Sequence, residues 1–157
     1  MNISENLKSF LEEKKLDKIT ASSVAKYLGI SKKTLSNYVN GDAYIPLNHL
    51  NKICNFFHVS LDYLLGLSNL ENYPDNIELE KLDAKEIGNR LREIRKSNKI
   101  TQDVVAKQIG VNKSSISRYE NGESLILTLC LYTFCQNYSI SSDYIIGKNQ
   151  NIYQKKS

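Results

Sequence analysis

The sequence predicts an all-α chain made of two small helical domains in tandem, and two observations lead to this prediction. From Ile19 to Gly66, each residue resembles the residue 81 positions later without a gap, and 18 of these 48 positions are identical. Within each copy, apolar residues recur at helical spacing in short segments that Gly, Ser and Asn interrupt. The repeat is longer than a solenoid unit of about 20–50 residues, so each copy is expected to hold its own core.

The domain boundaries follow from the repeat and from the distribution of charge. We place the first domain at residues 1–66, an acidic linker at 67–83, the second domain at 84–147 and a basic tail at 148–157. Lys and Arg outnumber Asp and Glu in both domains, whereas the linker carries five acidic residues against one lysine. The mild net charge of +4 therefore combines two basic domains with an acidic connector.

Five short helices are expected in each copy. In the second copy, Ile87, Leu91 and Ile94 form the apolar stripe of a first helix, and Thr101 caps a second helix that runs to about Gln108. Three more helices are expected at 112–120, 127–137 and 141–146, with Asn112 as a cap and Gly110, Asn121-Gly122 and Gly147 as stops. The first copy repeats this pattern with Leu7, Phe10 and Leu11 in the first helix, Thr20 and Ser31 as caps, Gly29 and Gly41 as stops, and Ser60 to Gly66 closing the copy.

Each copy also carries a small Ala, a Gly four residues later and an aliphatic residue six positions after the Gly. The Ala lets the next helix cross closely, the Gly permits a left-handed turn, and the aliphatic residue fixes the second helix to the core. This spacing is typical of a helix-turn-helix. The positions are Ala25, Gly29 and Leu35 in the first copy and Ala106, Gly110 and Ile116 in the second.

Residues 100–122, ITQDVVAKQIGVNKSSISRYENG, resemble the helix-turn-helix of the lambda-repressor/Cro-like (Xre-type) family. Segments 60–66 and 141–147 are similar to that family's fifth helix. The resemblance covers most of the chain and implies two lambda-repressor-like five-helix DNA-binding domains in tandem. The first copy departs from the pattern, because Ala21, Asn37 and Val39 stand where the second copy has Gln102, Arg118 and Glu120.

In this family the third helix lies in the major groove, with its N-terminal residues facing the base edges. In the second copy the resemblance implies base contacts from Lys113, Ser114, Ser115 and Arg118, and phosphate contacts from Gln102, Asn112 and Asn121. In the first copy it implies contacts from Lys32, Lys33, Thr34 and Asn37, with Ser31 and Asn40 as lesser contacts.

An argument from charge supports the same helices independently of the resemblance. Lys32, Lys33 and Lys113 lie in the first turn of a helix, where a positive charge opposes the helix dipole by about 0.3–1 kcal/mol. Stability alone favours Asp or Glu at these positions, so lysines there favour a site that a polyanion occupies. The alternative is that these lysines are solubilising surface residues.

We therefore expect a sequence-specific regulator of transcription that binds double-stranded DNA, and a repressor because repression is the family's commoner activity. A chain that uses both copies would prefer an asymmetric site. A homodimer would prefer a palindrome, and the apolar stretch 125–138 favours such a dimer through the fourth and fifth helices. The alternative is a protein-interaction module of antitoxin or inhibitor type, in which one copy binds a protein instead of DNA.

Other residues indicate structural roles. Tyr38, Tyr63, Tyr119 and Tyr144 recur at helical core positions, and Cys54 and Cys135 occupy equivalent core positions. No catalytic Ser/His/Asp or Cys/His set and no phosphate-binding Gly-rich loop is present, so an enzyme is not expected. His49, His58 and the three cysteines, which include Cys130, lack zinc-site spacing, so we expect neither metal nor cofactor. No apolar run approaches the roughly 18 residues of a membrane span, and we expect a cytoplasmic protein.

Overall fold

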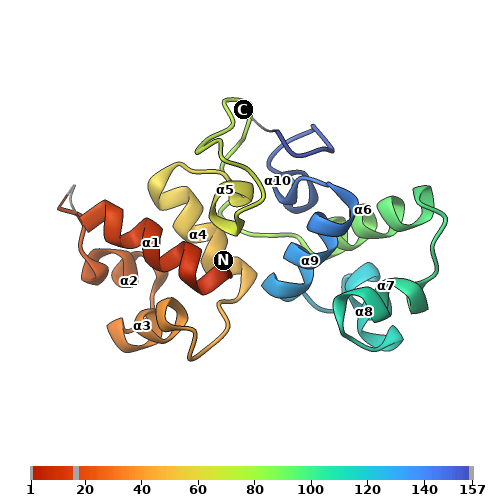
Figure 1. Cartoon of the computed structure of the whole chain (residues 1–157), viewed down its shortest axis with the longest axis horizontal. Helices are drawn as coiled ribbons and strands as arrows, with labels where there is room; N and C mark the ends of the chain where they lie inside the picture. The colour runs from red at the N-terminus through yellow and green to blue at the C-terminus, as the bar shows by residue number, and fades with distance from the viewer. Residues whose placement is uncertain (1, 16–17, 156–157) are drawn as a thin grey trace.

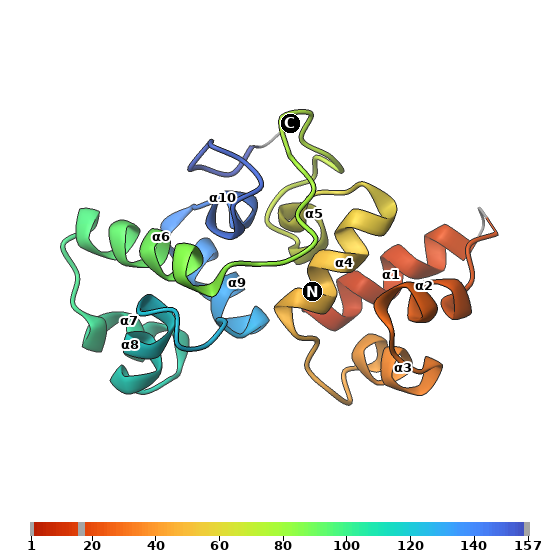
Figure 2. The ribbon, with the colours of Figure 1, turned by 180° about the vertical axis from the view of Figure 1, so that it is seen from behind.

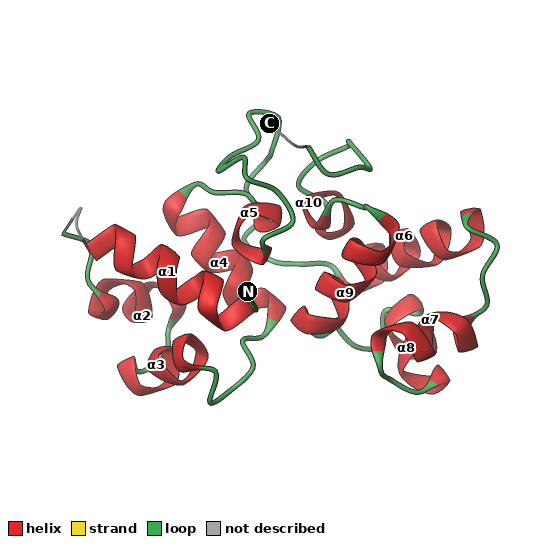
Figure 3. Cartoon of the chain, in the orientation of Figure 1, coloured by secondary structure: helices red, strands yellow, loops and turns green. Residues whose placement is uncertain are grey.

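The computed structural model describes residues 2–15 and 18–155, and their regular structure is helical apart from one antiparallel bridge between Ile140 and Tyr153 (Figures 1 and 3). The all-α prediction is confirmed. No helix in these ranges is long and apolar enough to cross a lipid bilayer. The helices are α1 (Ile3–Lys15), α2 (Ala21–Leu28), α3 (Lys32–Asn40), α4 (Leu47–Phe57), α5 (Leu61–Leu65), α6 (Ala84–Ser97), α7 (Gln102–Ile109), α8 (Lys113–Glu120), α9 (Thr128–Tyr138) and α10 (Ser142–Ile146).

The short helices begin and end at the residues that the sequence predicted. The Thr20 hydroxyl accepts a hydrogen bond from the Ser23 amide at the start of α2, and the Thr101 hydroxyl accepts one from the Val104 amide at the start of α7. Gly29 and Gly110 end these helices in the left-handed conformation, with φ of 73° and 78°. The tight corner between the two helices of each helix-turn-helix therefore depends on glycine, which adopts this conformation without a Cβ clash.

The backbone repeat extends further toward the N-terminus than the sequence repeat. Lys18 and Lys99, 81 residues apart, both have positive φ, of 65° and 57°, and His58 and Ser139 both have φ of 56° where α4 and α9 end. In addition, α1 and α6 each pack against the third helix of their own copy, although their sequences differ. The duplication thus includes the first helix of each copy.

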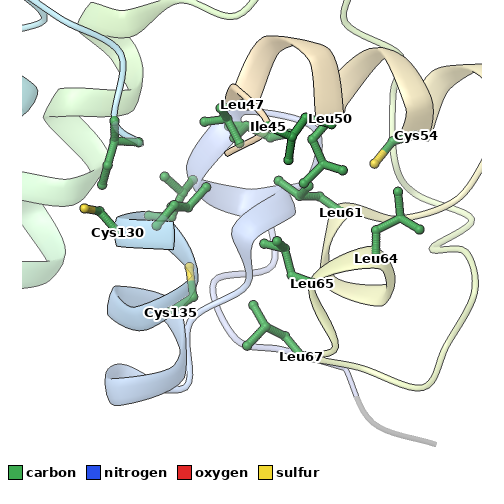
Figure 4. Packing of buried hydrophobic residues seen from close by; sticks show 14 of the residues in the cluster. Ile45, Leu47, Leu50, Cys54, Leu61, Leu64, Leu65, Leu67, Cys130 and Cys135 are labelled. Carbon is green, nitrogen blue, oxygen red and sulfur yellow. The ribbon is translucent and has the colours of Figure 1, made fainter. Parts of the chain in front are cut away.

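The two copies lie side by side, with α5 next to α10 and with α4 and α9 converging between them (Figures 1 and 2). Their cores are continuous. Figure 4 shows Leu47, Leu61 and Leu65 of the first copy in the same cluster as Cys130 and Cys135 on α9 of the second. Cys54 and Cys135 are buried, as predicted for small core residues.

The connector and the tail pack against this junction. Leu67 and Tyr73 are buried, and the carbonyl oxygen of Leu79 accepts hydrogen bonds from the side-chain amides of Asn51 and Asn55 on α4. Lys148, at the start of the tail, is also buried. Segments 67–83 and 148–155 therefore help to join the two copies, while the domain boundaries themselves stay a prediction.

Much of the apolar stretch 125–138 is covered within the chain itself. Ile126, Leu131 and Phe134 are buried and Leu125 is partly buried, whereas Leu127 and Leu129 remain exposed. The copies thus use their fourth and fifth helices to meet each other inside one chain. A homodimer through the same helices stays a prediction.

Candidate nucleic-acid interface

The start of α8 is organised by Asn112. Its side-chain oxygen Oδ1 accepts hydrogen bonds from the Ser115 amide at 2.9 Å, the Ser114 hydroxyl at 2.8 Å and the Ser115 hydroxyl at 2.9 Å. Asn112 is therefore the N-cap of the helix, and both serine hydroxyls point back toward it. Lys113 is exposed, with its ammonium nitrogen 3.8 Å from a carboxylate oxygen of Asp103 on α7.

The start of α3 has the same form with different residues. The Ser31 hydroxyl oxygen accepts a hydrogen bond from the Thr34 amide at 3.0 Å and lies 2.9 Å from the Thr34 hydroxyl. Lys32 and Lys33 follow the cap, and both are exposed. Within residues 2–15 and 18–155, neither lysine forms an ion pair.

The starts of α3 and α8 carry positive charge. The first turns of α3 and α8 contain no acidic residue, whereas Asp83 caps α6 and Glu86 lies in its first turn. At α3 and α8 the positive end of the helix dipole therefore coincides with lysine ammonium groups. Such a helix start attracts an anion, since both the exposed amides and the lysines favour negative charge.

The side chains at the ends of the two helices are partly committed to local contacts. Asn121 accepts a hydrogen bond from Arg92 Nη2 at 2.6 Å, and Asn40 donates from Nδ2 to the Ser36 hydroxyl at 3.1 Å. Asn37 is half-buried, whereas Arg118 is exposed. Among the predicted residues of α8, Arg118 and Lys113 are thus the exposed cations.

Glu120, at the last turn of α8, is 2% exposed and sits in a cluster of positive and polar groups. Arg95 donates from Nε to Glu120 Oε2 at 2.7 Å and from Nη2 to Oε1 at 3.0 Å, and Arg92 Nε lies 3.4 Å from Oε1. Gln102 donates from Nε2 to Oε1 at 3.1 Å. Burial opposes ionisation of Glu120, but the bonds from Arg95, Gln102 and Arg92 outweigh it and keep the pKa of this carboxyl below its ordinary value.

This cluster ties α6, α7 and α8 together, and sequence reasoning did not find Arg92 and Arg95. A signal was present, because the equivalent positions of the first copy all change at once. Leu11, Lys14, Ala21 and Val39 stand where the second copy has Arg92, Arg95, Gln102 and Glu120. The first copy therefore lacks this Gln and this Glu because all four positions of the internal cluster carry other residues there.

The predicted contact residues gather into two sets, one on each helix-turn-helix. Helices α3 and α8 lie at the two ends of the same side of the molecule, the lower edge in Figures 1 and 2. The two sets are therefore separate from each other but can approach one extended ligand from the same side. Whether each of these residues contacts DNA stays a prediction.

The tyrosines have the packing role that the sequence predicted. Tyr38 and Tyr119 are each 8% exposed, and Tyr63 and Tyr144 pack against the core. The Tyr38 hydroxyl lies 3.1 Å from Nδ1 of His49, which is partly buried. Tyr38 and Tyr119 are therefore too deeply buried to act as stacking platforms for bases.

Comparison with known proteins gives one family match for each copy. Residues 6–69 match the model described as a Cro/C1-type HTH DNA-binding domain, and residues 88–150 match a model described as a helix-turn-helix domain. Each match omits the beginning of the first helix of its copy, α1 or α6, and includes the other four helices of that copy.

Two curated proteins are similar to parts of the chain. The antitoxin PezA of Streptococcus pneumoniae is 34% identical over 64 residues, which are 41% of this chain and 40% of that protein. The uncharacterized HTH-type transcriptional regulator YobD of Bacillus subtilis is 38% identical over 58 residues, which are 37% of this chain and 52% of that protein. The chain thus spans about two fifths and about half of the length of these relatives.

Two solved structures are similar to one copy's length of the chain. The P22 c2 repressor in complex with a synthetic operator is 30% identical, with a TM-score of 0.38, and the match covers 40% of this chain and 96% of that one. The restriction-modification controller protein C.AhdI of Aeromonas hydrophila is 20% identical, with a TM-score of 0.37, and the match covers 41% and 96% of the two chains.

Proposed function

Because the chain belongs to the Cro/C1-type helix-turn-helix family, with two such domains in tandem, we propose that it binds double-stranded DNA sequence-specifically and represses transcription. The observation that carries this proposal is the placement of α3 and α8 on one side of the molecule (Figure 1), with exposed Lys32 and Lys33 at the start of α3 and exposed Lys113 at the start of α8. Lysines there neutralise phosphates, and the helices themselves enter the major groove. One chain then binds two half-sites about 34–36 Å apart.

In this proposal the second copy supplies the stronger base contact. Arg118 is exposed and reaches guanine O6 and N7 with two hydrogen bonds, whereas Asn37 in the first copy pairs with adenine. Gln102 uses one amide hydrogen for Glu120, and its second amide hydrogen remains for a phosphate. Ser31 and Asn112 act mainly by capping their helices, so that the first-turn amides keep their direction toward the phosphate backbone.

The proposal is tested by selecting binding sites from a random duplex library with the full chain and then measuring the affinity of variants for the selected site. Lys113→Ala with Arg118→Ala is expected to weaken binding by about 1–3 kcal/mol because the arginine no longer pairs with guanine. Loss of the lysine, which no longer neutralises a phosphate, should weaken binding further. Lys32→Ala with Lys33→Ala is expected to lower the slope of log affinity against log salt by about 0.9 for each phosphate that is no longer neutralised.

The matched control is Lys81→Ala with Lys96→Ala, which removes two exposed lysines outside α3 and α8. This double variant is expected to bind as the unsubstituted chain does. If the affinity is equally insensitive to all three pairs of substitutions, the regulator proposal is wrong.

A second function is favoured by the relative named as an antitoxin and by three exposed apolar side chains. Tyr44, Leu127 and Leu129 are 87%, 60% and 49% exposed and lie on the α3–α4 connection and at the start of α9. In this alternative, one copy binds a protein instead of DNA, and the partner contacts these side chains, to which both copies contribute. If the Lys113 and Arg118 substitutions weaken DNA binding and the Lys32 and Lys33 substitutions do not, protein binding by the first copy is favoured.

A further inference from the structure

The fifth helices of the two copies lie next to each other (Figures 1 and 2). A carboxylate of each copy lies at the start of the other copy's fifth helix. The carboxylates belong to Asp62 on α5 and Asp143 on α10, which are equivalent residues of the repeat. Both are 0% exposed. Two buried carboxylates are costly unless hydrogen bonds compensate them, so their partners define what they do.

Each carboxylate caps the helix of the opposite copy. Asp143 Oδ1 accepts a hydrogen bond from the Leu61 amide at 2.8 Å, and its Oδ2 accepts one from the Asp62 amide at 2.9 Å. In return, Asp62 Oδ1 accepts from the Ser142 amide at 2.6 Å, and its Oδ2 accepts from the Ser141 hydroxyl at 2.7 Å. Bonds from backbone amides to carboxylates are short, strong and directional, and here they cross between the copies in both directions.

The remaining acceptor positions are filled from the connector. The Tyr73 hydroxyl donates to Asp62 Oδ2 at 2.8 Å, and Asn76 Nδ2 donates to Asp143 Oδ1 at 2.9 Å. The buried Lys148 of the tail donates to the side-chain oxygen of Asn55 on α4 at 2.8 Å. The connector and the tail thus add polar contacts at the junction, and the bonds that cross between the copies constrain the rotation of one copy against the other.

An apolar contact would hold the copies together without these bonds. The shared core already supplies such contact, and apolar packing is roughly non-directional. Buried carboxylates add little net stability compared with apolar residues of the same volume, but they require one particular arrangement of their donors. Helices α3 and α8 lie at the far ends of the two copies, so a small rotation at the junction moves them by a large amount (Figure 1).

We propose that Asp62 and Asp143 are positioning residues that fix the distance and angle between α3 and α8, so that the chain accepts two DNA half-sites at a single spacing. This inference rests on the proposed function, because it specifies which duplexes the two domains bind together. The paired carboxylates select the number of base pairs between half-sites without contacting DNA.

The first experiment measures the arrangement without DNA. Spin labels at Ser22→Cys and Lys107→Cys, both exposed positions outside α3 and α8, report the distance between the copies by pulsed electron spin resonance, and the native cysteines are buried. We expect one narrow distance distribution in the otherwise unsubstituted chain and a clearly broader one with Asp62→Asn or Asp143→Asn. Equally narrow distributions in all three proteins, or a broad one without the Asn substitutions, would overturn the inference whatever the DNA affinity.

The second experiment uses duplexes that carry the selected site with one or two base pairs inserted or removed between the half-sites. The unsubstituted chain is expected to bind each wrong spacing about tenfold more weakly, equivalent to about 1.4 kcal/mol. Asp62→Asn and Asp143→Asn are expected to flatten this dependence and to keep their affinity for a single half-site, which reports that each copy is folded. Glu93→Gln, which also changes a carboxylate to an amide but at an exposed position of α6, is the control and should retain the full dependence.

Ser142→Ala provides a milder test, since it removes only a hydroxyl donor to Asp62 and leaves the Ser142 amide bond in place. It is expected to flatten the spacing dependence partly. An unchanged spacing profile in both Asn variants contradicts the positioning role while leaving DNA binding itself established. Spacing-independent binding by the unsubstituted chain contradicts it in the same way.

Discussion

The two copies keep the same backbone with different chemistry beneath the third helix. In the second copy a buried Glu120 is held by Arg92, Arg95 and Gln102, whereas in the first copy the equivalent positions carry no buried carboxylate. A charged cluster and an apolar contact therefore support the same helix arrangement. Residues that are replaced together in one copy thus mark a change in how the helices are supported internally, and they do not by themselves indicate a loss of DNA binding.

A second difference lies where the first helix crosses the third. Gly88 of α6 has no side chain because α8 passes directly over it, and a Cβ there would collide with the carbonyl oxygens of Tyr119 and Glu120. The first copy has Leu7 at the equivalent position, and this leucine is buried. The crossing is thus tighter in the second copy, where the side chains of α6 and α8 also exchange hydrogen bonds.

The largest effect that separates the copies is expected from Glu120→Ala. Removing the carboxylate leaves Arg95 largely buried without its partner, and breaking a buried pair in this way costs about 3 kcal/mol or more. Val39→Ala, the equivalent change in the first copy, removes only two half-buried methyl groups and should cost about 1 kcal/mol. Chemical denaturation followed by circular dichroism measures both, and equal losses of stability would contradict the difference between the copies.

A smaller effect is expected from Gly88→Ala. The added methyl group forces α6 and α8 apart, and overpacking of this kind costs about 1–3 kcal/mol, partly offset by the better helix propensity of Ala. Asn89→Ala, at the next and exposed position of α6, is the control and should be neutral or slightly stabilising. If thermal unfolding shows Gly88→Ala to be as stable as Asn89→Ala, the tight crossing is not required.

The smallest effect concerns pH. Burial, and then the negative charge of Asp62, raise the pKa of the Asp143 carboxyl to about 6. The folded protein therefore binds a proton that the unfolded chain releases, so the contribution of Asp143 to stability rises as the pH falls from 7 to 5, by about 1 kcal/mol. Asp62 and Asp143 together face the buried Lys148 and the thiols of Cys54 and Cys135 within this junction.

The measurement is the free energy of unfolding at pH 7 and pH 5 for the unsubstituted chain and for Asp143→Asn, which lacks this proton. The increase in the free energy of unfolding from pH 7 to pH 5 should be present only in the unsubstituted chain. The contribution of Glu120 to stability changes with pH in the opposite direction. Because the pKa of its carboxyl is lowered in the folded protein, this contribution is lost as the pH falls through the lowered pKa. A gain of equal size in Asp143→Asn would assign the pH response to other groups.

Most of the fold could be predicted from sequence because its signals are local. Caps such as Thr20, Thr101 and Asn112 and stops such as Gly29 and Gly110 act within four residues of their own position, and the structure has each of them as expected. The placement of Lys32, Lys33 and Lys113 at helix starts follows from the same local signals.

The junction between the copies could not be predicted in the same way. Asp62 and Asp143 are visible in the sequence only as an identical pair, and nothing within either copy states that each faces the other copy's helix. Arg92 and Arg95 resemble any exposed cations of an amphipathic helix until α8 is placed against them. Interactions between segments far apart in sequence depend on how helices pack, and single-residue patterns do not contain that information.

Covalent linkage of the two copies has a consequence for how occupancy of a DNA site depends on protein concentration. Two separate subunits must first associate, so their active form disappears on dilution faster than the total protein does. In this chain the second domain is always held near the first at an effective concentration that the junction sets. For a tandem protein of this kind, the fraction of DNA sites occupied would follow a simple hyperbola in protein concentration. This dependence would hold at concentrations at which a dissociating dimer would already be monomeric.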